Sequence, residues 1–114
     1  MSTKNIKIHI PRGKVSAIGP GKADLLEAIQ HSGSISAAAR QMGMSYKRAW
    51  DLVEEMNRLF GKPVVSAQTG GRKGGGAQLT QAGLAIVSRF RAIERAAESA
   101  AEPHMAALQA EIAA

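Results

Sequence analysis

The sequence predicts a mainly α-helical fold with small β-hairpins, an α+β arrangement in one small domain. Most of the 114 residues fall into segments whose apolar side chains recur every three or four positions, as on one face of a helix. Two shorter segments are strand-like and lie beside glycine- or proline-containing turns, as hairpins do. A chain of this length buries enough surface to fold without disulfide bonds or a structural metal, and it contains no cysteine.

The N-terminal segment is predicted to form a first hairpin at about residues 5–18. Residues 5–10 alternate apolar and polar side chains, which places three isoleucines on one face. Proline and glycine within residues 11–13 predict a turn, and residues 15–18 then return as the partner strand.

Two helices are predicted after this hairpin. The first is amphipathic, covers about residues 22–31 and is followed by a glycine. The second is short and lies within residues 34–43. Ser34 or Ser36 is placed to cap its N-terminus, and Gly43 supplies a left-handed exit.

A longer helix is predicted from Ser45, its N-cap, to about Phe60. One of its faces is apolar at helical spacing and therefore predicted to be buried: Ala49, Leu52, Val53, Met56, Leu59 and Phe60. The opposite face is charged: Lys47, Asp51, Glu54 and Arg58.

The spacing of residues 35–53 is typical of a helix-turn-helix unit. Ala39 stands four positions before Gly43, so that two helices can cross closely at a small residue and turn at a glycine. In such a unit the N-terminal end of the second helix enters the DNA major groove. Here that end carries hydroxyls and basic groups, which suit phosphates and guanine edges: Ser45, Tyr46, Lys47 and Arg48.

A second hairpin is predicted directly after this helix, with strands at residues 63–68 and 77–79. A glycine-rich turn joins them and carries Arg72 and Lys73. A hairpin in this place is the layout of a winged helix. We expect the two basic side chains of its tip to reach DNA phosphates or the adjacent minor groove.

The distribution of charge supports a polyanionic partner. Fifteen Lys and Arg stand against nine Asp and Glu, a net charge of +6, and the pI is about 10.2. The excess of basic over acidic side chains lies entirely in residues 1–48, which contain eight basic and two acidic side chains. Residues 28–50 and 56–93 contain no acid. These windows include the start of the predicted recognition helix and the wing, so the charge favours duplex DNA.

Other classes of function find no support in the sequence. The three histidines are scattered and no cysteine accompanies them, so we expect no metal site. No nucleophile or carboxylate pair has a catalytic spacing, and we expect neither an enzyme nor a bound cofactor. Aromatic residues are only 4%, too few for a base-stacking platform. No apolar run is long enough to span a membrane, and we expect a cytoplasmic location.

Four motifs together resemble a known family: Gly-Ser-Ile-Ser-x-Ala-Ala at residues 33–39, Gly-x-Ser-Tyr-Lys-x-Ala-Trp-Asp at 43–51, Glu-Met-Asn at 55–57 and Gly-Gly-x-Lys-Gly-Gly-Gly-Ala-x-Leu-Thr at 70–80. Over about residues 19–95 the chain resembles the N-terminal domain of ModE, the bacterial molybdate-responsive transcriptional regulator. The ending Leu-Thr-x-Ala-Gly at residues 79–83 is also similar to LysR-type winged helices.

The resemblance implies a winged helix-turn-helix DNA-binding domain at residues 1–80 and a C-terminal helical dimerisation segment at residues 81–114. Full-length ModE also carries a C-terminal molybdate-binding region, for which this chain leaves no room. We therefore expect a stand-alone form without it, or a form whose effector region was removed or lies on another polypeptide. Trp50 belongs to the signature, and we favour packing on the helix flank for it. We expect the following residues to face DNA: Ser34, Ser36, Ser45, Tyr46, Lys47, Arg48, Asp51, Arg72 and Lys73.

A long helix capped by Thr80 is predicted to follow the wing, and Pro103 is predicted to kink or end it before a second amphipathic segment. The apolar stripe of this region exceeds what one small domain needs. It predicts a two-fold homodimer, which suits a palindromic operator. The residues expected at that interface are Leu84, Val87, Ile93, Ala97, Met105, Leu108 and Ile112.

The function favoured by the sequence is a sequence-specific, double-stranded-DNA-binding transcriptional regulator that represses by occupying its operator. Two alternatives remain open. The basic face of a winged helix also suits an acidic protein, which would make the chain an interaction module. A crevice between two copies would suit an oxyanion such as molybdate or tungstate, which would make the chain a sensor.

Overall fold

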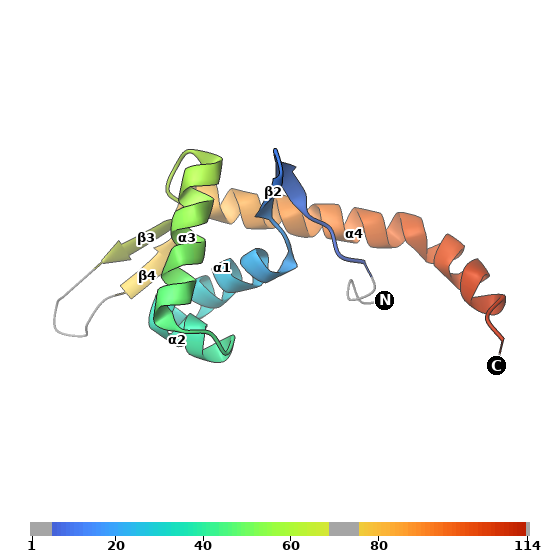
Figure 1. The fold of residues 1–114 in the computed structure, drawn as a ribbon, viewed down its shortest axis with the longest axis horizontal. Coiled ribbons are helices and arrows are strands. Elements are labelled where there is room, and N and C mark those ends of the chain that lie inside the picture. Colours follow the sequence, from blue (N-terminus) through green and yellow to red (C-terminus); the bar gives the residue numbers. More distant parts are fainter. Residues whose placement is uncertain (1–5, 69–75, 114) are drawn as a thin grey trace.

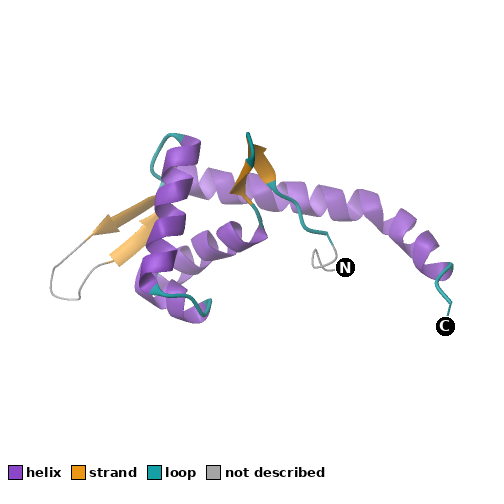
Figure 2. Cartoon of the chain, in the orientation of Figure 1, coloured by secondary structure: helices purple, strands orange, loops and turns teal. Residues whose placement is uncertain are grey.

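The computed structural model describes residues 6–68 and 76–113. Four helices and two separate two-stranded antiparallel sheets follow one another along the chain (Figure 1, Figure 2). The predicted fold class, mainly α with small hairpins, is confirmed. The elements are β1 (Ile10–Arg12), β2 (Val15–Ile18), α1 (Pro20–Ser32), α2 (Ile35–Gln41), α3 (Tyr46–Phe60), β3 (Val65–Gln68), β4 (Gly76–Leu79) and α4 (Gln81–Ala110).

Local capping sets most of the helix ends. Hydroxyl side chains at the N-caps of α2, α3 and α4 each accept a hydrogen bond from the backbone N–H three residues on, which satisfies a group that the helix leaves open: Ser34, Ser45 and Thr80. Gly33 and Gly61 end α1 and α3 in the left-handed conformation, with φ of 75° and 71°, which favours glycine. The predicted bounds of α2 and α3 are therefore close to those observed.

One apolar core joins all the elements of the domain. The predicted inner face of α3 lies in it, with Ala49, Val53, Met56 and Leu59 buried and Leu52 and Phe60 partly buried. Helix α1 is its centre, and the sheet β3–β4 and the first half of α4 close it. The largest fully buried side chains are Phe90, Leu25, Leu26, Ile29, Met56, Val53 and Val64.

The N-terminal hairpin differs from its prediction. Residues 6–9 lie outside any strand, Ile10 pairs with Ile18, and the register shifts between Ile10 and Pro11. Pro11 and Arg12 belong to β1, so the predicted strand at residues 5–10 and the turn at residues 11–13 are wrong in their bounds. Ile8 and Ile10 pack against the core. Their alternation therefore reflects burial of one side of an extended segment, and strand pairing does not accompany it.

The second hairpin forms where it was predicted. Its register runs from Val65 opposite Leu79 to Gln68 opposite Gly76. The tip with Arg72 and Lys73 lies outside the described residues.

Helix α4 gives the molecule its elongated shape. Its 30 residues correspond to a length of about 45 Å, and the whole molecule measures 59 × 30 × 22 Å. Figure 1 shows the helix passing behind the domain and continuing beyond it, with a bend in its last turns. Pro103 lies inside this helix, so it does not end α4, and no separate second segment begins there. Within the described chain, no helix combines the length and apolar composition that crossing a bilayer requires.

Candidate nucleic-acid interface

Helices α2 and α3 form the helix-turn-helix that the sequence predicts. Ala39, near the end of α2, is 2% exposed, and its small side chain permits the close crossing of the two helices. Gly43 makes the turn with φ of 67°. The turn is closed by the backbone N–H of Met44, which donates to the carbonyl oxygen of Ala39 at 3.0 Å. The start of α3 is therefore held in a fixed orientation to α2.

The first turn of α3 combines a capped helix end with exposed basic side chains. The Ser45 hydroxyl accepts a hydrogen bond from the backbone N–H of Arg48 at 3.0 Å. Tyr46, Lys47 and Arg48 are all exposed, and the first turn contains no acid. The positive end of the helix dipole and its free N–H groups favour an anion at this position.

Lys47 and Asp51 lie on the exposed side of α3 and form an ion pair at 3.0 Å, one helical turn apart. Exposed pairs of this kind contribute only about 0.3–0.5 kcal/mol. The pair is weak enough for the Lys47 ammonium to exchange the carboxylate for a phosphate or a base edge.

An aromatic pair flanks this surface. The rings of Tyr46 and Trp50 meet edge to face, with centroids 6.3 Å apart and an interplanar angle of 75°. Tyr46 is 54% exposed, whereas Trp50 is partly buried and packs against the core. The contact places Trp50 in a packing role beneath Tyr46.

Helix α2 adds polar groups beside the start of α3. Ser34 accepts from the backbone N–H of Ala37 at 3.1 Å, so its hydroxyl serves as the helix cap. Ser36 accepts a hydrogen bond from the guanidinium of Arg40 at 2.9 Å on an exposed surface. Arg40 thus joins the basic groups of this end of the molecule, although the sequence motifs did not single it out as a site residue.

The base of the wing is fixed to the end of α1 and to α3 by hydrogen bonds that the sequence did not predict. The backbone N–H of Ala77 donates to the carbonyl oxygen of Gly33, and that of Leu79 donates to the side-chain oxygen of Gln30, both at 2.8 Å. On the other strand segment, the backbone N–H of Val64 donates to the Asn57 side chain at 2.8 Å. Of the anchoring side chains, only Asn57 belongs to a quoted motif. Helical periodicity gives no signal for Gln30.

One basic side chain of residues 1–48, that of Lys22, is engaged inside the protein. Lys22 donates to the carbonyl oxygen of Ser16 at 2.7 Å and pairs with Glu55. The hydrogen bond that Lys22 donates to the Glu55 carboxylate lowers the pKa of Glu55, against a smaller opposing effect of burial. Lys22 thereby ties α1 to β2 and α3.

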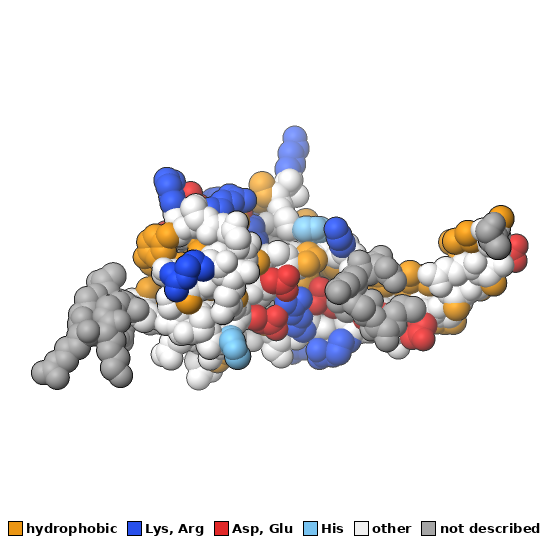
Figure 3. All heavy atoms as spheres, turned by 90° about the horizontal axis from the view of Figure 1, so that it is seen from below, with side chains coloured by type: hydrophobic (Ala, Val, Ile, Leu, Met, Phe, Trp, Pro, Cys, Tyr) orange, Lys and Arg blue, Asp and Glu red, His pale blue; other side chains and the backbone are white. Residues whose placement is uncertain are grey.

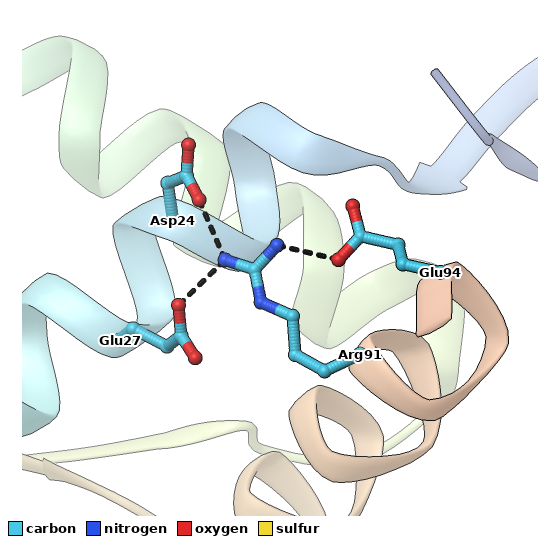
Figure 4. Close-up of polar contacts among 4 residues, drawn as sticks. All are labelled: Asp24, Glu27, Arg91 and Glu94. Atoms are coloured by element: carbon cyan, nitrogen blue, oxygen red, sulfur yellow. Dashed lines mark hydrogen bonds and ion pairs between the residues drawn. The ribbon is translucent and has the colours of Figure 1, made fainter. Parts of the chain in front are cut away.

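Arg91 is the centre of a second internal cluster, which joins α4 to α1 (Figure 4). Its guanidinium contacts Asp24 and Glu27 at 2.5 Å each and Glu94 at 2.8 Å. The hydrogen bond to Glu27 raises the pKa of Arg91, burial opposes this, and Glu94 and Asp24 raise it further. Arg91 lies in an acid-free stretch of the sequence, yet three carboxylates contact its guanidinium.

Helix α2 and the first turn of α3 contain no acidic side chain, whereas Asp51, Glu54 and Glu55 lie further along α3. Figure 3 shows several other acidic side chains in the middle of the molecule and toward the C-terminal end of its long axis. Glu94 and Glu98 are buried on α4, at 5% and 9% exposure. Exposed basic side chains lie on α2, at the start of α3 and on the N-terminal hairpin.

The residues expected at a dimer interface differ in how far they are buried. Val87 is 7% exposed and belongs to the core of its own domain, whereas Leu84 and Ile93 are 45% and 41% exposed. Leu108 and Ile112 are 68% and 69% exposed. Ala97 and Met105 are partly buried.

Comparison with known proteins shows the family. Residues 22–84 match the family described as bacterial regulatory helix-turn-helix protein, lysR family. The chain is 44% identical over 89 residues to the molybdenum-pterin-binding protein MopA of Rhodobacter capsulatus (78% of this chain, 34% of MopA). It is 46% identical over 85 residues to the molybdenum transport protein ModE of Azotobacter vinelandii (75% and 32%). To the DNA-binding transcriptional dual regulator ModE of Escherichia coli K12 it is 45% identical over 71 residues (62% and 27%).

Solved structures agree on the fold. A CbnR_DBD chain, from the crystal structure of a CbnR_DBD–DNA complex, superposes with a TM-score of 0.59 at 20% identity, over 77% of this chain and 95% of that one. ArgP from Mycobacterium tuberculosis superposes with a TM-score of 0.54 at 20% identity, over 75% and 30%. The chain spans about a third of the length of the curated relatives it matches. It belongs to the lysR family of bacterial regulatory helix-turn-helix proteins and resembles the N-terminal region of the ModE regulators.

Proposed function

We propose that this chain is a transcriptional regulator that binds duplex DNA in the cytoplasm, through the start of α3 and the wing. One observation carries the proposal. Tyr46, Lys47 and Arg48 are exposed together at a capped helix N-terminus whose first turn has no acid. The relatives to which the chain is similar include a protein named as a DNA-binding transcriptional dual regulator.

The proposed contacts divide into two kinds. Lys47 and Arg48 read base edges in the major groove, with Tyr46 and Asp51 beside them. The phosphates are bound by Ser36, Arg40 and the wing residues Arg72 and Lys73, and these contacts fix the position of the protein along the duplex. Ser34 and Ser45 cap α2 and α3, and the N-terminal ends of these two helices face the backbone of the DNA. We further propose that the chain represses by occupying its operator.

A two-fold homodimer completes the proposal. Exposed apolar side chains follow α4 beyond the domain, at Leu108, and just past its end, at Ile112. Pairing of two copies along this helix would present two recognition helices to one face of the duplex. The expected operator is an inverted repeat whose half-sites lie about one helical turn, roughly 34 Å, apart.

The experiment begins with selection of bound duplexes from a random pool, followed by titrations at several salt concentrations. Lys47→Ala or Arg48→Ala should cost about 1–3 kcal/mol on the selected site and relax its sequence preference. Arg72→Ala should weaken all duplexes alike and reduce the slope of log affinity against log salt by about 1. Arg95→Ala, which removes an exposed charge from α4, is the matched control.

Unchanged affinity in the Lys47, Arg48 and Arg72 variants would overturn the proposed interface. Wild-type protein that fails to retain any duplex, yet binds an acidic protein in a salt-sensitive manner, would favour the interaction-module alternative.

A further inference from the structure

The exposed start of α3 carries one acid among its basic groups. Asp51 is the first acidic residue after Glu27, and its side chain is 54% exposed beside that of Lys47. A carboxylate is repelled by DNA phosphates, whose field extends over a Debye length of roughly 10 Å. An acid on such a surface adds selectivity and not general affinity.

The position of Lys47 gives α3 little stability. A cation in the first turn lies at the positive end of the helix dipole, and a lysine four residues before an acid is the less favourable order for a helical ion pair. The Lys47 ammonium nevertheless lies 3.0 Å from the Asp51 carboxylate. The pair is therefore better explained by a ligand than by the stability of the helix.

We propose that Lys47 and Asp51 together recognise a single G·C base pair in the major groove, with Lys47 over the guanine and Asp51 over the cytosine. The inference rests on the DNA binding proposed above and makes Asp51 a residue that determines its specificity. Although the ion pair is weak, it need not break, because an ammonium has three N–H donors and a carboxylate accepts several hydrogen bonds.

The spacing of the two charged groups matches that base pair. In the major groove the guanine O6 is an acceptor and the cytosine N4 amino group is a donor. A Watson–Crick hydrogen bond joins these two atoms, so they lie about 2.9 Å apart. The Lys47 Nζ and the Asp51 Oδ2 are 3.0 Å apart. The ammonium can therefore donate to O6 while the carboxylate accepts the amino hydrogen that base pairing leaves free.

The groups beside these atoms distinguish G·C from T·A, which also offers an acceptor next to a donor. Beside O6, guanine presents N7 as a second acceptor for Lys47, whereas thymine presents its methyl group beside O4. Beside the amino group, cytosine presents only C–H to Asp51, whereas adenine presents the acceptor N7, which repels a carboxylate. The reversed pairs C·G and A·T place a donor against Lys47 and an acceptor against Asp51, so both are excluded.

The Lys47–Asp51 pair carries no net charge, so the general attraction to phosphates comes from other side chains. Arg40, proposed above to bind phosphates, is exposed on α2. The Ser45 hydroxyl is engaged in the cap of α3. Selectivity and general affinity are thereby carried by different side chains, and mutations can separate them.

The test is selection of bound sites from a random duplex pool by the wild type, Lys47→Ala, Asp51→Ala and Asp51→Asn. The wild type should select G·C at one position, and both alanine variants should lose the preference at that same position. For Asp51→Ala the ratio of affinities for G·C and T·A there should fall about tenfold. Asp51→Asn should select T·A instead, because an amide pairs with N6 and N7 of adenine.

Glu54→Gln is the matched control, since Glu54 is an exposed acid three residues further along the same helix and its loss removes the same charge. It should keep the G·C preference. A change in the DNA isolates the contact itself. N4-methylcytosine at the selected position, whose methyl group replaces the amino hydrogen in the major groove, should weaken binding of the wild type about tenfold and leave that of Asp51→Ala unchanged.

Several results would overturn the shared recognition and leave DNA binding standing. These are a selected site without G·C, a cytosine preference kept by Asp51→Ala or Asp51→Asn, losses in the Lys47 and Asp51 variants at different base pairs, and a wild type indifferent to N4-methylcytosine. Wild-type protein that retains no duplex would refute the proposed function, and this inference with it.

Discussion

Replacement of Gly83 by alanine tests how the wing is joined to α4. Gly83 is buried in the first turn of α4, where its backbone lies directly against the segment before β3. A Cβ added to it would stand 2.1 Å from the carbonyl oxygen of Val64 and 3.3 Å from the Cβ of Leu79. Both are far from solvent, and the nearer atom belongs to the backbone, so no side-chain rotation relieves the overlap.

The magnitude follows from three contributions. Overpacking of a close contact typically costs about 1–3 kcal/mol. Separation of α4 from this segment also weakens the hydrogen bond from the Thr80 N–H to the Val64 carbonyl, 3.1 Å long, at about 1 kcal/mol. The better helix propensity of alanine returns about 1 kcal/mol. We expect Gly83→Ala to lower the free energy of unfolding by about 1–3 kcal/mol and Tm by roughly 5–20 °C.

Thermal and urea unfolding, followed by circular dichroism at one protomer concentration, measures this loss. Gly21→Ala is the matched control, because Gly21 is also helical and a Cβ there meets nothing within 4 Å. The control should leave stability unchanged or raise it by up to about 1 kcal/mol. If Gly83→Ala proved as stable as Gly21→Ala, the close approach of α4 to Val64 would be refuted.

Three further predictions concern the charges and the cap. Arg91→Gln should destabilise the domain by about 2–3 kcal/mol in urea unfolding, because Glu94 loses its cation while 5% exposed. A loss no larger than that of Arg95→Gln, which changes an exposed arginine of the same helix, would contradict this expectation. The lowered pKa of Glu55 contributes stability that is present above its usual value of 4.5 and is lost as the pH falls through the lowered value. Glu55→Gln should therefore cost less than about 1 kcal/mol at neutral pH and nothing in strong acid, with Glu54→Gln as an exposed control in the same urea titrations. Ser45→Ala should cost about 1 kcal/mol of stability through loss of the cap. Ser45→Asp should keep the cap and still weaken duplex binding, and equal DNA affinity of the Asp variant and the wild type would place α3 away from the phosphates.

The helices were predictable because their limits are local. Ser34, Ser45 and Thr80 cap the helix that follows each of them, and this chemistry depends on a few neighbouring residues. The helix-turn-helix was predictable for the same reason, since Ala39 and Gly43 act within one short segment.

Features that depend on distant residues were not predictable in this way. Arg91 lies in an acid-free stretch of sequence, but two of its three carboxylate partners are more than 60 residues away, on α1. Gln30 anchors a strand 49 residues further along. The strand pattern of residues 5–10 failed because packing of one side of an extended segment gives the same alternation as pairing in a sheet.

The most direct test of the proposed interface is a titration of the isotope-labelled chain with a selected duplex, followed by amide chemical-shift changes. The account predicts the largest changes at residues 34–36, 45–51 and 69–75, with the Asp24–Arg91 contact and Ile93 little affected. Changes confined to the N-terminal hairpin or to α4, with the start of α3 undisturbed, would contradict it.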